Sequence, residues 1–250
     1  MVAAEPHRPA RPGLLGWPRE PSRKTCTMAR QLRLSLRGSP DYSRARFAEG
    51  PSNTQAVAAV DAWPAWHAGT LALIGPEGAG KTHLARAWAD AADAVVLERE
   101  LPDLDLGAGR PVLVEDVDRG MSEEALFHLI NMAGRAGGGL LVTARTPPRA
   151  WPAKLPDLRS RLNALPLALI EAPCDIVLEA VLRKLFRERS IRPKPDVFPY
   201  LLRRMERSVV HAREIVRRID EAGDESGRAI SRALARQILD GDNENLDLFE

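Results

Sequence analysis

Residues 70–91, TLALIGPEGAGKTHLARAWADA, place an apolar run, a glycine-rich loop and an amphipathic helix directly after one another. The run 70–74 predicts a buried strand, and residues 75–82 match the pattern G-x-x-x-x-G-K-[ST] of phosphate-binding loops. A chance glycine turn is the alternative, but a strand before the loop and a helix after it argue against that interpretation. We therefore expect backbone N–H groups of this loop to face the phosphates of a nucleotide.

Two side chains of the loop have expected roles. Lys81 would pair with the β and γ phosphates, and the Thr82 hydroxyl would bind Mg²⁺. The full set of nucleotide contacts predicted in the loop is Gly75, Pro76, Gly78, Ala79, Gly80, Lys81 and Thr82.

A site of this kind also needs acidic residues at the end of a neighbouring strand. The apolar run 112–114 ends in Glu115 and Asp116. One acid would orient Mg²⁺ through water, and the other would polarise an attacking water molecule. An ordinary acidic strand end is the alternative, which we disfavour beside a phosphate loop. Asp118 lies further out and is expected at the surface.

Further apolar runs alternate with helical patterns around the loop. Strands are expected at 94–98, 112–115, 139–143 and 167–170, in addition to 70–74. Because strands alternate with helices such as 54–63 and 122–136, the pattern indicates an α/β fold with a parallel five-stranded sheet flanked by helices.

The pattern changes after residue 174, where apolar residues recur at helical spacing. Further helices are expected at 196–206, 209–222 and 226–239. We therefore predict a tail at 1–44, a nucleotide-binding α/β domain at 45–173, an all-helical lid domain at 174–240 and an acidic tail at 241–250.

Composition and charge limit the classes of function. The chain has 250 residues with a net charge of +2, but residues 1–49 carry ten Lys and Arg against four Asp and Glu, which leaves the rest acidic. That distribution does not suit a reader of duplex DNA. No run is long enough for a membrane helix or a signal peptide, and the two cysteines lack metal or redox spacing. We expect a cytoplasmic protein, and the Pro- and Arg-rich segment 1–27 suggests that Met28 is the true first residue.

Several segments together resemble the AAA+ ATPases of the bacterial replication initiator DnaA. They are GPSN at 50–53, GKTHLA at 80–85, TARTPP at 143–148, SRL at 160–162 and ARE at 212–214. The resemblance implies a P-loop NTPase with a C-terminal helical lid, and ATP or ADP with Mg²⁺ as cofactors.

The resemblance also implies roles for single residues. Segment 50–53, with Pro51 and Asn53, would lie over the adenine base, and His83 would belong to the nucleotide site. Thr143 would be the first sensor, and Arg213 would be the second sensor, contacting phosphate from the lid. Arg161 would be the arginine finger that reaches the nucleotide of a neighbouring subunit.

Three departures from the initiator pattern alter this expectation. The chain lacks the initiator's C-terminal helix-turn-helix, and only residues 99–111 stand where the initiator has a longer helical insertion. Arg145 stands where relatives usually carry Asp, and Glu115-Asp116 stands for Asp-Asp. Since Arg145 in place of Asp reverses a charge, we expect this chain to stimulate ATP hydrolysis in trans rather than to turn over ATP itself.

An initiator-like ATPase without the initiator's DNA-binding parts resembles the Hda-type regulators. That family binds the replicative sliding clamp and stimulates ATP hydrolysis by DnaA, which restrains initiation. Its clamp contact has the form Q-L-x-L-x-L, here Gln31, Leu32, Leu34 and Leu36 within residues 31–36. An edge strand or an apolar tail is the alternative for this stretch, and NLDLF at 245–249 is a rival clamp motif.

The resemblance implies the sliding clamp and DnaA as partners, allows a homo-oligomer, and implies at most indirect contact with DNA and none with a membrane. Two other functions stay open. One is a helicase-loader-like ATPase, and the other is a passive adaptor that holds nucleotide without hydrolysing it.

Overall fold

A computed structural model describes residues 41–97, 109–135, 137–226 and 230–246. The clamp motif at 31–36, the link at 98–108 and residues 247–250 lie outside these ranges. The strands are β1 Thr70–Ile74, β2 Val95–Leu97, β3 Pro111–Val114, β4 Gly139–Ala144 and β5 Leu167–Leu169. The helices are α1 Thr54–Asp61, α2 Lys81–Ala91, α3 Glu123–Ala133, α4 Pro156–Ala164, α5 Asp175–Glu188, α6 Val197–Arg204, α7 Val209–Ser226 and α8 Arg232–Leu246.

The five strands form one parallel sheet in the order β2-β3-β4-β1-β5, which confirms the predicted fold class. Strand β1 lies between β4 and the edge strand β5 and pairs with both. Its end at Ile74 pairs with Ala144 of β4. Because the strands are parallel, the residues that follow β1, β3 and β4 meet at one edge of the sheet.

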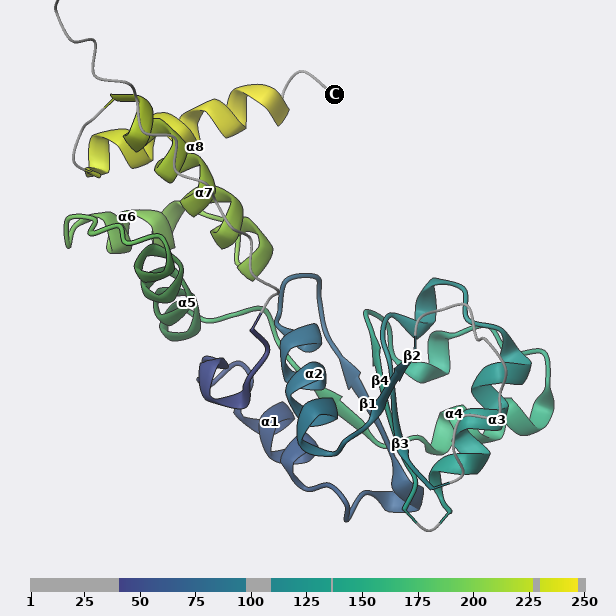
Figure 1. The fold of residues 1–250 in the computed structure, drawn as a ribbon. Helices are drawn as coiled ribbons and strands as arrows, with labels where there is room; N and C mark the ends of the chain where they lie inside the picture. The colour runs from purple at the N-terminus through teal and green to yellow at the C-terminus, as the bar shows by residue number, and fades with distance from the viewer. Residues whose placement is uncertain (1–40, 98–108, 136, 227–229, 247–250) are drawn as a thin grey trace, which may run out of the picture. The chain divides into compact units, whose positions relative to one another are not determined.

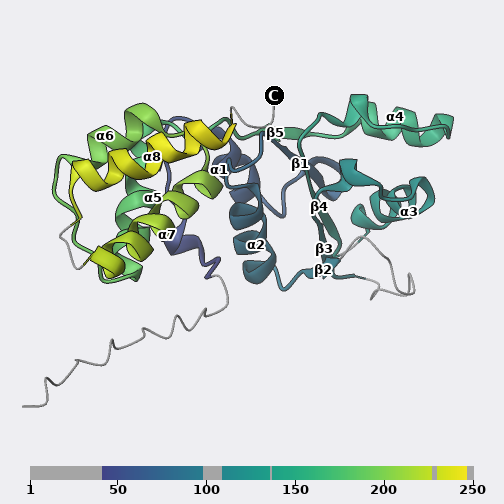
Figure 2. The same ribbon diagram turned by 90° about the horizontal axis from the view of Figure 1, so that it is seen from above.

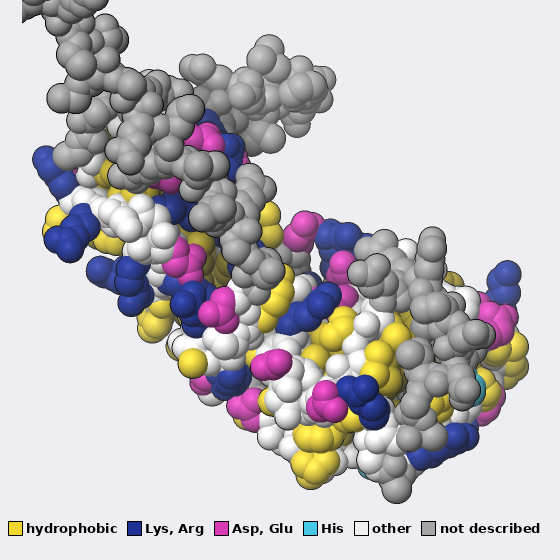
Figure 3. Space-filling model, viewed as in Figure 1, with side chains coloured by type: hydrophobic (Ala, Val, Ile, Leu, Met, Phe, Trp, Pro, Cys, Tyr) yellow, Lys and Arg dark blue, Asp and Glu magenta, His cyan; other side chains and the backbone are white. Residues whose placement is uncertain are grey.

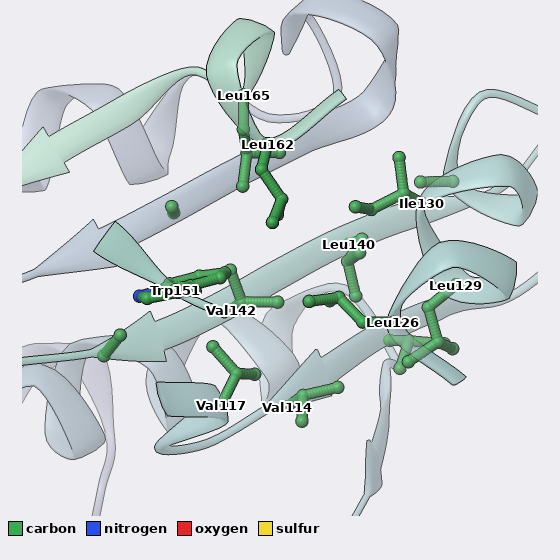
Figure 4. Packing of buried hydrophobic residues seen from close by; sticks show 14 of the residues in the cluster. Val114, Val117, Leu126, Leu129, Ile130, Leu140, Val142, Trp151, Leu162 and Leu165 are labelled. Carbon is green, nitrogen blue, oxygen red and sulfur yellow. The ribbon is translucent and has the colours of Figure 1, made fainter. Parts of the chain in front are cut away.

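Helices cover both faces of the sheet. Figures 1 and 2 show α1 and α2 on one side, with α3 and α4 on the other. Successive side chains of a strand point to opposite faces, so neighbouring residues enter two different cores. Leu71, Leu73, Leu113 and Leu141 pack with α1 and α2, whereas Ala72, Ile74, Val112, Val114, Leu140 and Val142 pack with α3 and α4. Figure 4 shows the second of these cores, in which Trp151 lies beside Val142.

Helices α5–α8 share a separate hydrophobic core that contains no residue of the sheet. Phe186 of α5 and Phe198 of α6 meet edge to face there, with ring centroids 5.8 Å apart. The last helix departs from the expected range 226–239, because it begins at Arg232 and continues to Leu246. No helix of the described residues is both long and apolar enough to span a bilayer.

The charged side chains of the described residues are mixed in sign on the face that Figure 3 shows. Over the α/β domain, described Lys and Arg are interspersed with Asp and Glu, whereas several Lys and Arg lie near one another over α5 and α6.

Candidate functional site

The glycine-rich loop joins β1 to α2, as the sequence predicts, and its glycines are required by close packing. A Cβ on Gly75 would lie 2.2 Å from the carbonyl oxygen of Ile170. Gly78 has a φ of +72°, and a Cβ there would lie 2.1 Å from Ser208 Oγ. A side chain at Gly75 would therefore collide with the backbone that follows β5, and one at Gly78 would collide with Ser208 and strain its own backbone.

Lys81 is the first residue of α2 and is only 7% exposed. Its ammonium donates to the carbonyl oxygens of Gly75 at 2.7 Å and Pro76 at 2.8 Å. Burial lowers the pKa of Lys81, and the charge of Asp116 opposes that shift. The structure thus places the ammonium inside the loop, with Thr82 exposed beside it at the start of the helix.

Glu115 lies at the end of β3 and is held by an arginine of α2. Arg86 Nε donates to Glu115 Oε2 at 2.7 Å, and a second guanidinium nitrogen lies 2.5 Å from the same oxygen. Glu115 Oε1 is buried, with no hydrogen-bond partner within the part of the chain that the structure describes. Arg86 lies four residues after Thr82 and so faces the same side of α2.

These residues fit a magnesium ion carried by a nucleotide. Mg²⁺ keeps several waters and takes one or two protein oxygens beside phosphate oxygens. The exposed Thr82 hydroxyl is one candidate ligand, and Glu115 Oε1 is an unused carboxylate oxygen for a metal-bound water. Among the described residues no cluster of three or more His, Cys, Asp or Glu could hold a metal without such help.

Asp116 and Thr143 lie together at the same edge of the sheet. The backbone N–H of Asp116 donates to Thr143 Oγ1 at 3.0 Å, and the Thr143 side chain is buried. Asp116 has a φ of +52°, which Asp tolerates better than most residues, and its carboxylate lies 3.7 Å from Arg119. The structure therefore brings together two residues that the sequence placed 27 positions apart.

Arg145 follows β4 directly and forms an ion pair with Glu77 of the phosphate loop. Its backbone N–H donates to Asp118 Oδ2 at 2.8 Å, and the Thr146 N–H donates to the same oxygen at 3.0 Å. Asp118 was expected to be a surface residue, but it fixes the turn that carries Arg145.

The lid helix α7 begins against the phosphate loop. The N–H of Val209 donates to the carbonyl oxygen of Gly78 at 2.9 Å, and Ser208 is packed against the same glycine. Arg213 lies one turn further along α7, where its charge contributes to lowering the pKa of His83. Arg213 is therefore near His83 on α2, and its contact with phosphate stays a prediction.

His83 faces a strap formed by residues 41–49 and does not point into the loop. Its Nε2 lies 3.1 Å from the carbonyl oxygen of Ser43, and its ring packs edge-on against Tyr42 and Phe47. Burial lowers the pKa of His83, the contact with Ser43 opposes this, and Lys184 and Arg213 add to the lowering. The residue thus joins the strap to α2.

His83 is expected to make stability depend on pH. Because the folded protein lowers its pKa below about 6.5, the unfolded chain binds the proton more readily. The contribution of His83 is present above that pH and is lost as the pH falls towards the folded-state pKa. The free energy of unfolding, measured in urea from about pH 8 to about pH 5.5, should fall less steeply in His83→Gln than in the wild type. The exposed His67→Gln is the matched control, and equal slopes in all three proteins would contradict this expectation.

The segment 50–53 closes on itself. Asn53 Oδ1 accepts from the N–H of Gly50 at 2.9 Å, and its amide donates to the carbonyl oxygen of Ala48 at 2.9 Å. Asn53 is 3% exposed, whereas Pro51 is exposed. Asn53 therefore shapes the segment, and Pro51 presents the surface that a base could contact.

Arg161 lies on α4, on the opposite face of the sheet from α2. Its guanidinium lies over the ring of Phe127 at 5.3 Å, and its Nε is 3.6 Å from Asp157. The side chain is 40% exposed. The structure does not bring Arg161 together with Lys81 and Glu115 in one chain.

Sequence reasoning missed Arg86, Glu77, Asp118 and Ser208 as parts of this site. Each acts through a contact with a residue distant in sequence, and although Glu77 stands inside the phosphate-loop motif, the motif gives that position no role. The spacing of Arg86 and Thr82 on one helix face was the only available signal.

Domain III of the Thermotoga maritima replication initiation protein DnaA superposes with a TM-score of 0.67 at 19% identity, covering 81% of this chain and 97% of that domain. The chain has the AAA+ P-loop fold. A similar AAA+ structure is AMPPCP-bound DnaA from Aquifex aeolicus, with a TM-score of 0.61 at 19% identity over 74% of this chain and 67% of the other.

Sequence similarity points the same way. The chain is 26% identical over 231 residues to the chromosomal replication initiator protein DnaA of Thermomicrobium roseum, across 80% of this chain. The match spans 50% of that relative's length. No family profile matches the chain.

Proposed function

We propose that this AAA+ protein binds ATP or ADP with Mg²⁺ in the loop 75–82. The buried Lys81 ammonium, held inside a glycine-rich loop at the start of α2, is the observation that carries the proposal. Helix N-termini and lysines of this kind bind phosphate in other P-loop proteins. The similarity to an AMPPCP-bound DnaA supports an adenine nucleotide.

We further propose that the chain restrains replication initiation by binding the sliding clamp and stimulating ATP hydrolysis on DnaA. Arg161 supports a role in trans, because its helix α4 covers the face of the sheet opposite α2, the helix that follows the phosphate loop, and its side chain remains partly exposed. Mg²⁺ would supply charge neutralisation at the phosphates, while the Thr82 hydroxyl would be a ligand and Glu115 would hold a metal-bound water. Glu115, Asp116 and Thr143 would organise the chain's own site.

Hydrolysis by purified DnaA tests this function. ATP turnover is measured with and without this protein, the clamp and DNA, each omitted in turn. We expect stimulation only when the protein and the clamp are both present. An unchanged rate in the complete mixture would reject the regulatory function and leave nucleotide binding untouched.

The N-terminal leucines are expected to recruit the clamp. Changing Leu34 and Leu36 together to alanine should remove the protein from clamp pull-downs. Burial of each leucine side chain in the clamp would contribute about 1.5–3 kcal/mol of binding free energy. Ordering of the segment consumes much of that energy, so binding of one motif should be weak. Leu248 and Phe249 changed to alanine provide the matched comparison. Loss of binding only in this second variant would assign the clamp contact to the C-terminal motif.

A passive adaptor that holds nucleotide without turnover is the second candidate. It is favoured by the Arg86–Glu115 pair, since Arg86 occupies one oxygen of the acid expected beside Mg²⁺. Measurable single-turnover hydrolysis of ATP by the isolated protein would exclude this candidate.

A further inference from the structure

Arg145 brings a positive charge to the edge of the sheet where the phosphate loop begins. The paired ends of β1 and β4 set this position, because the N–H of Gly75 donates to the carbonyl oxygen of Ala144 at 3.2 Å. Gly75, which follows β1, and Arg145, which follows β4, are therefore neighbours across the two paired strands. From there the Arg145 guanidinium reaches Glu77, the third residue of the phosphate loop.

The base of the Arg145 side chain is fixed, whereas its end has an exchangeable partner. Asp118 Oδ2 holds the N–H groups of Arg145 and Thr146 and also accepts from Thr146 Oγ1 at 3.1 Å. The ion pair at the other end is open to solvent, with the side chain of Arg145 37% exposed and that of Glu77 63% exposed. An exposed pair of this type contributes little to stability, so Glu77 can be exchanged for a stronger acceptor.

The guanidinium also lies near the buried ammonium of the loop. The charge of Arg145 contributes to lowering the pKa of Lys81, which places the two cations within electrostatic reach. In phosphate loops the lysine pairs with the β and γ phosphates. An arginine beside the lysine can donate two parallel hydrogen bonds to phosphate oxygens. A carboxylate such as that of Glu77 accepts from a guanidinium in the same geometry, so the two acceptors can replace one another.

We propose that Arg145 binds the terminal phosphate of a triphosphate held in the loop of its own chain, and that Glu77 holds the guanidinium when that phosphate is absent. The chain thereby distinguishes ATP from ADP. The proposal rests on the proposed nucleotide binding.

Calorimetric titration with ADP and with the triphosphate analogue AMPPCP tests it. In Arg145→Ala, AMPPCP should bind about 10- to 100-fold more weakly, the range of a charge-assisted hydrogen bond, while ADP changes less than about threefold. Arg145→Lys should recover part of the loss, because lysine keeps the charge but not the two parallel donors. Arg149→Ala, an exposed arginine of the same loop region, is the control.

Glu77→Gln gives an independent measurement with the opposite sign. Removing the competing carboxylate should strengthen AMPPCP binding more than ADP binding. This gain should be smaller when Arg145 is already alanine, because much of it comes from releasing the guanidinium.

Each outcome decides a separate point. An AMPPCP-to-ADP affinity ratio that stays unchanged in Arg145→Ala overturns the proposal. A lower unfolding temperature with equal loss for both ligands identifies a structural ion pair and also overturns it. If the wild type binds neither ligand, the proposed nucleotide binding fails. If the wild type binds ADP but Arg145→Ala leaves AMPPCP binding unchanged, nucleotide binding stands and only the role of Arg145 fails.

Discussion

Stimulation of DnaA is expected to disappear when Arg161 is replaced by alanine. An arginine supplied in trans accelerates other NTPases by about 10³- to 10⁵-fold, so the initiator should return to its unstimulated rate. The guanidinium is partly exposed and held over Phe127 of α3. Leu158 and Leu162, on the same helix, are fully buried and anchor it to the sheet. The substitution therefore removes a charge from a helix that stays in place.

The Arg161 measurement needs two companions. Arg161→Lys keeps the charge without the planar fork and should restore only a small part of the stimulation. Arg187→Ala changes an exposed arginine at the end of α5 and should stimulate like the wild type. Full stimulation by Arg161→Ala, with clamp binding intact, would show that another residue reaches the initiator's nucleotide.

The central fold could be predicted because its signals are local. Each strand is an apolar run next to a turn, and the run 70–74 leads directly into a loop whose glycines have no substitute. The alternation of strands with helices along the sequence predicts a parallel sheet, and the observed strands pair in parallel. The predicted ends of the first strand match the observed ones, and those of the other strands differ by at most one residue, as expected where pairing sets the limit.

The last helix shows why a periodic pattern can mislead. Ile230 fits the helical spacing of Leu234 and Ile238, which favoured a helix from 226. In the structure Ile230 is buried from a non-helical segment, and its carbonyl oxygen accepts from the N–H of Lys194 at 3.2 Å. Ile230 is thus held by a contact with a residue 36 positions earlier and not by a helix.

The ion pairs of the site could not be predicted for a related reason. The chain contains 36 Lys and Arg, and helical spacing says only that an arginine is on a surface. Arg86 and Arg145 acquire partners because α2 lies along β3 and because β1 ends beside β4. The sequence identified the acid and the phosphate loop but not the cations that hold them.

Lys81→Ala is expected to weaken the binding of both ADP and AMPPCP by about 30- to several-thousand-fold, the range for removing one partner of a buried charge pair. The ammonium is buried and already directed into the loop by the carbonyls of Gly75 and Pro76, so little ordering energy remains to be supplied on binding. Calorimetric titration measures the loss, and urea unfolding measures the separate cost of leaving those two carbonyls without a donor.

Lys154→Ala, at an exposed lysine before α4, is the control and should bind both ligands like the wild type. A Lys81→Ala protein that is folded and still binds ADP within about threefold of the wild type would contradict a phosphate role for the loop. The roles of Lys81 and Arg145 can then be told apart by which ligand each substitution weakens. Loss of both nucleotides with Lys81 but only of the triphosphate with Arg145 requires two positions along the phosphate chain, because an effect of overall positive charge would weaken both ligands in both variants.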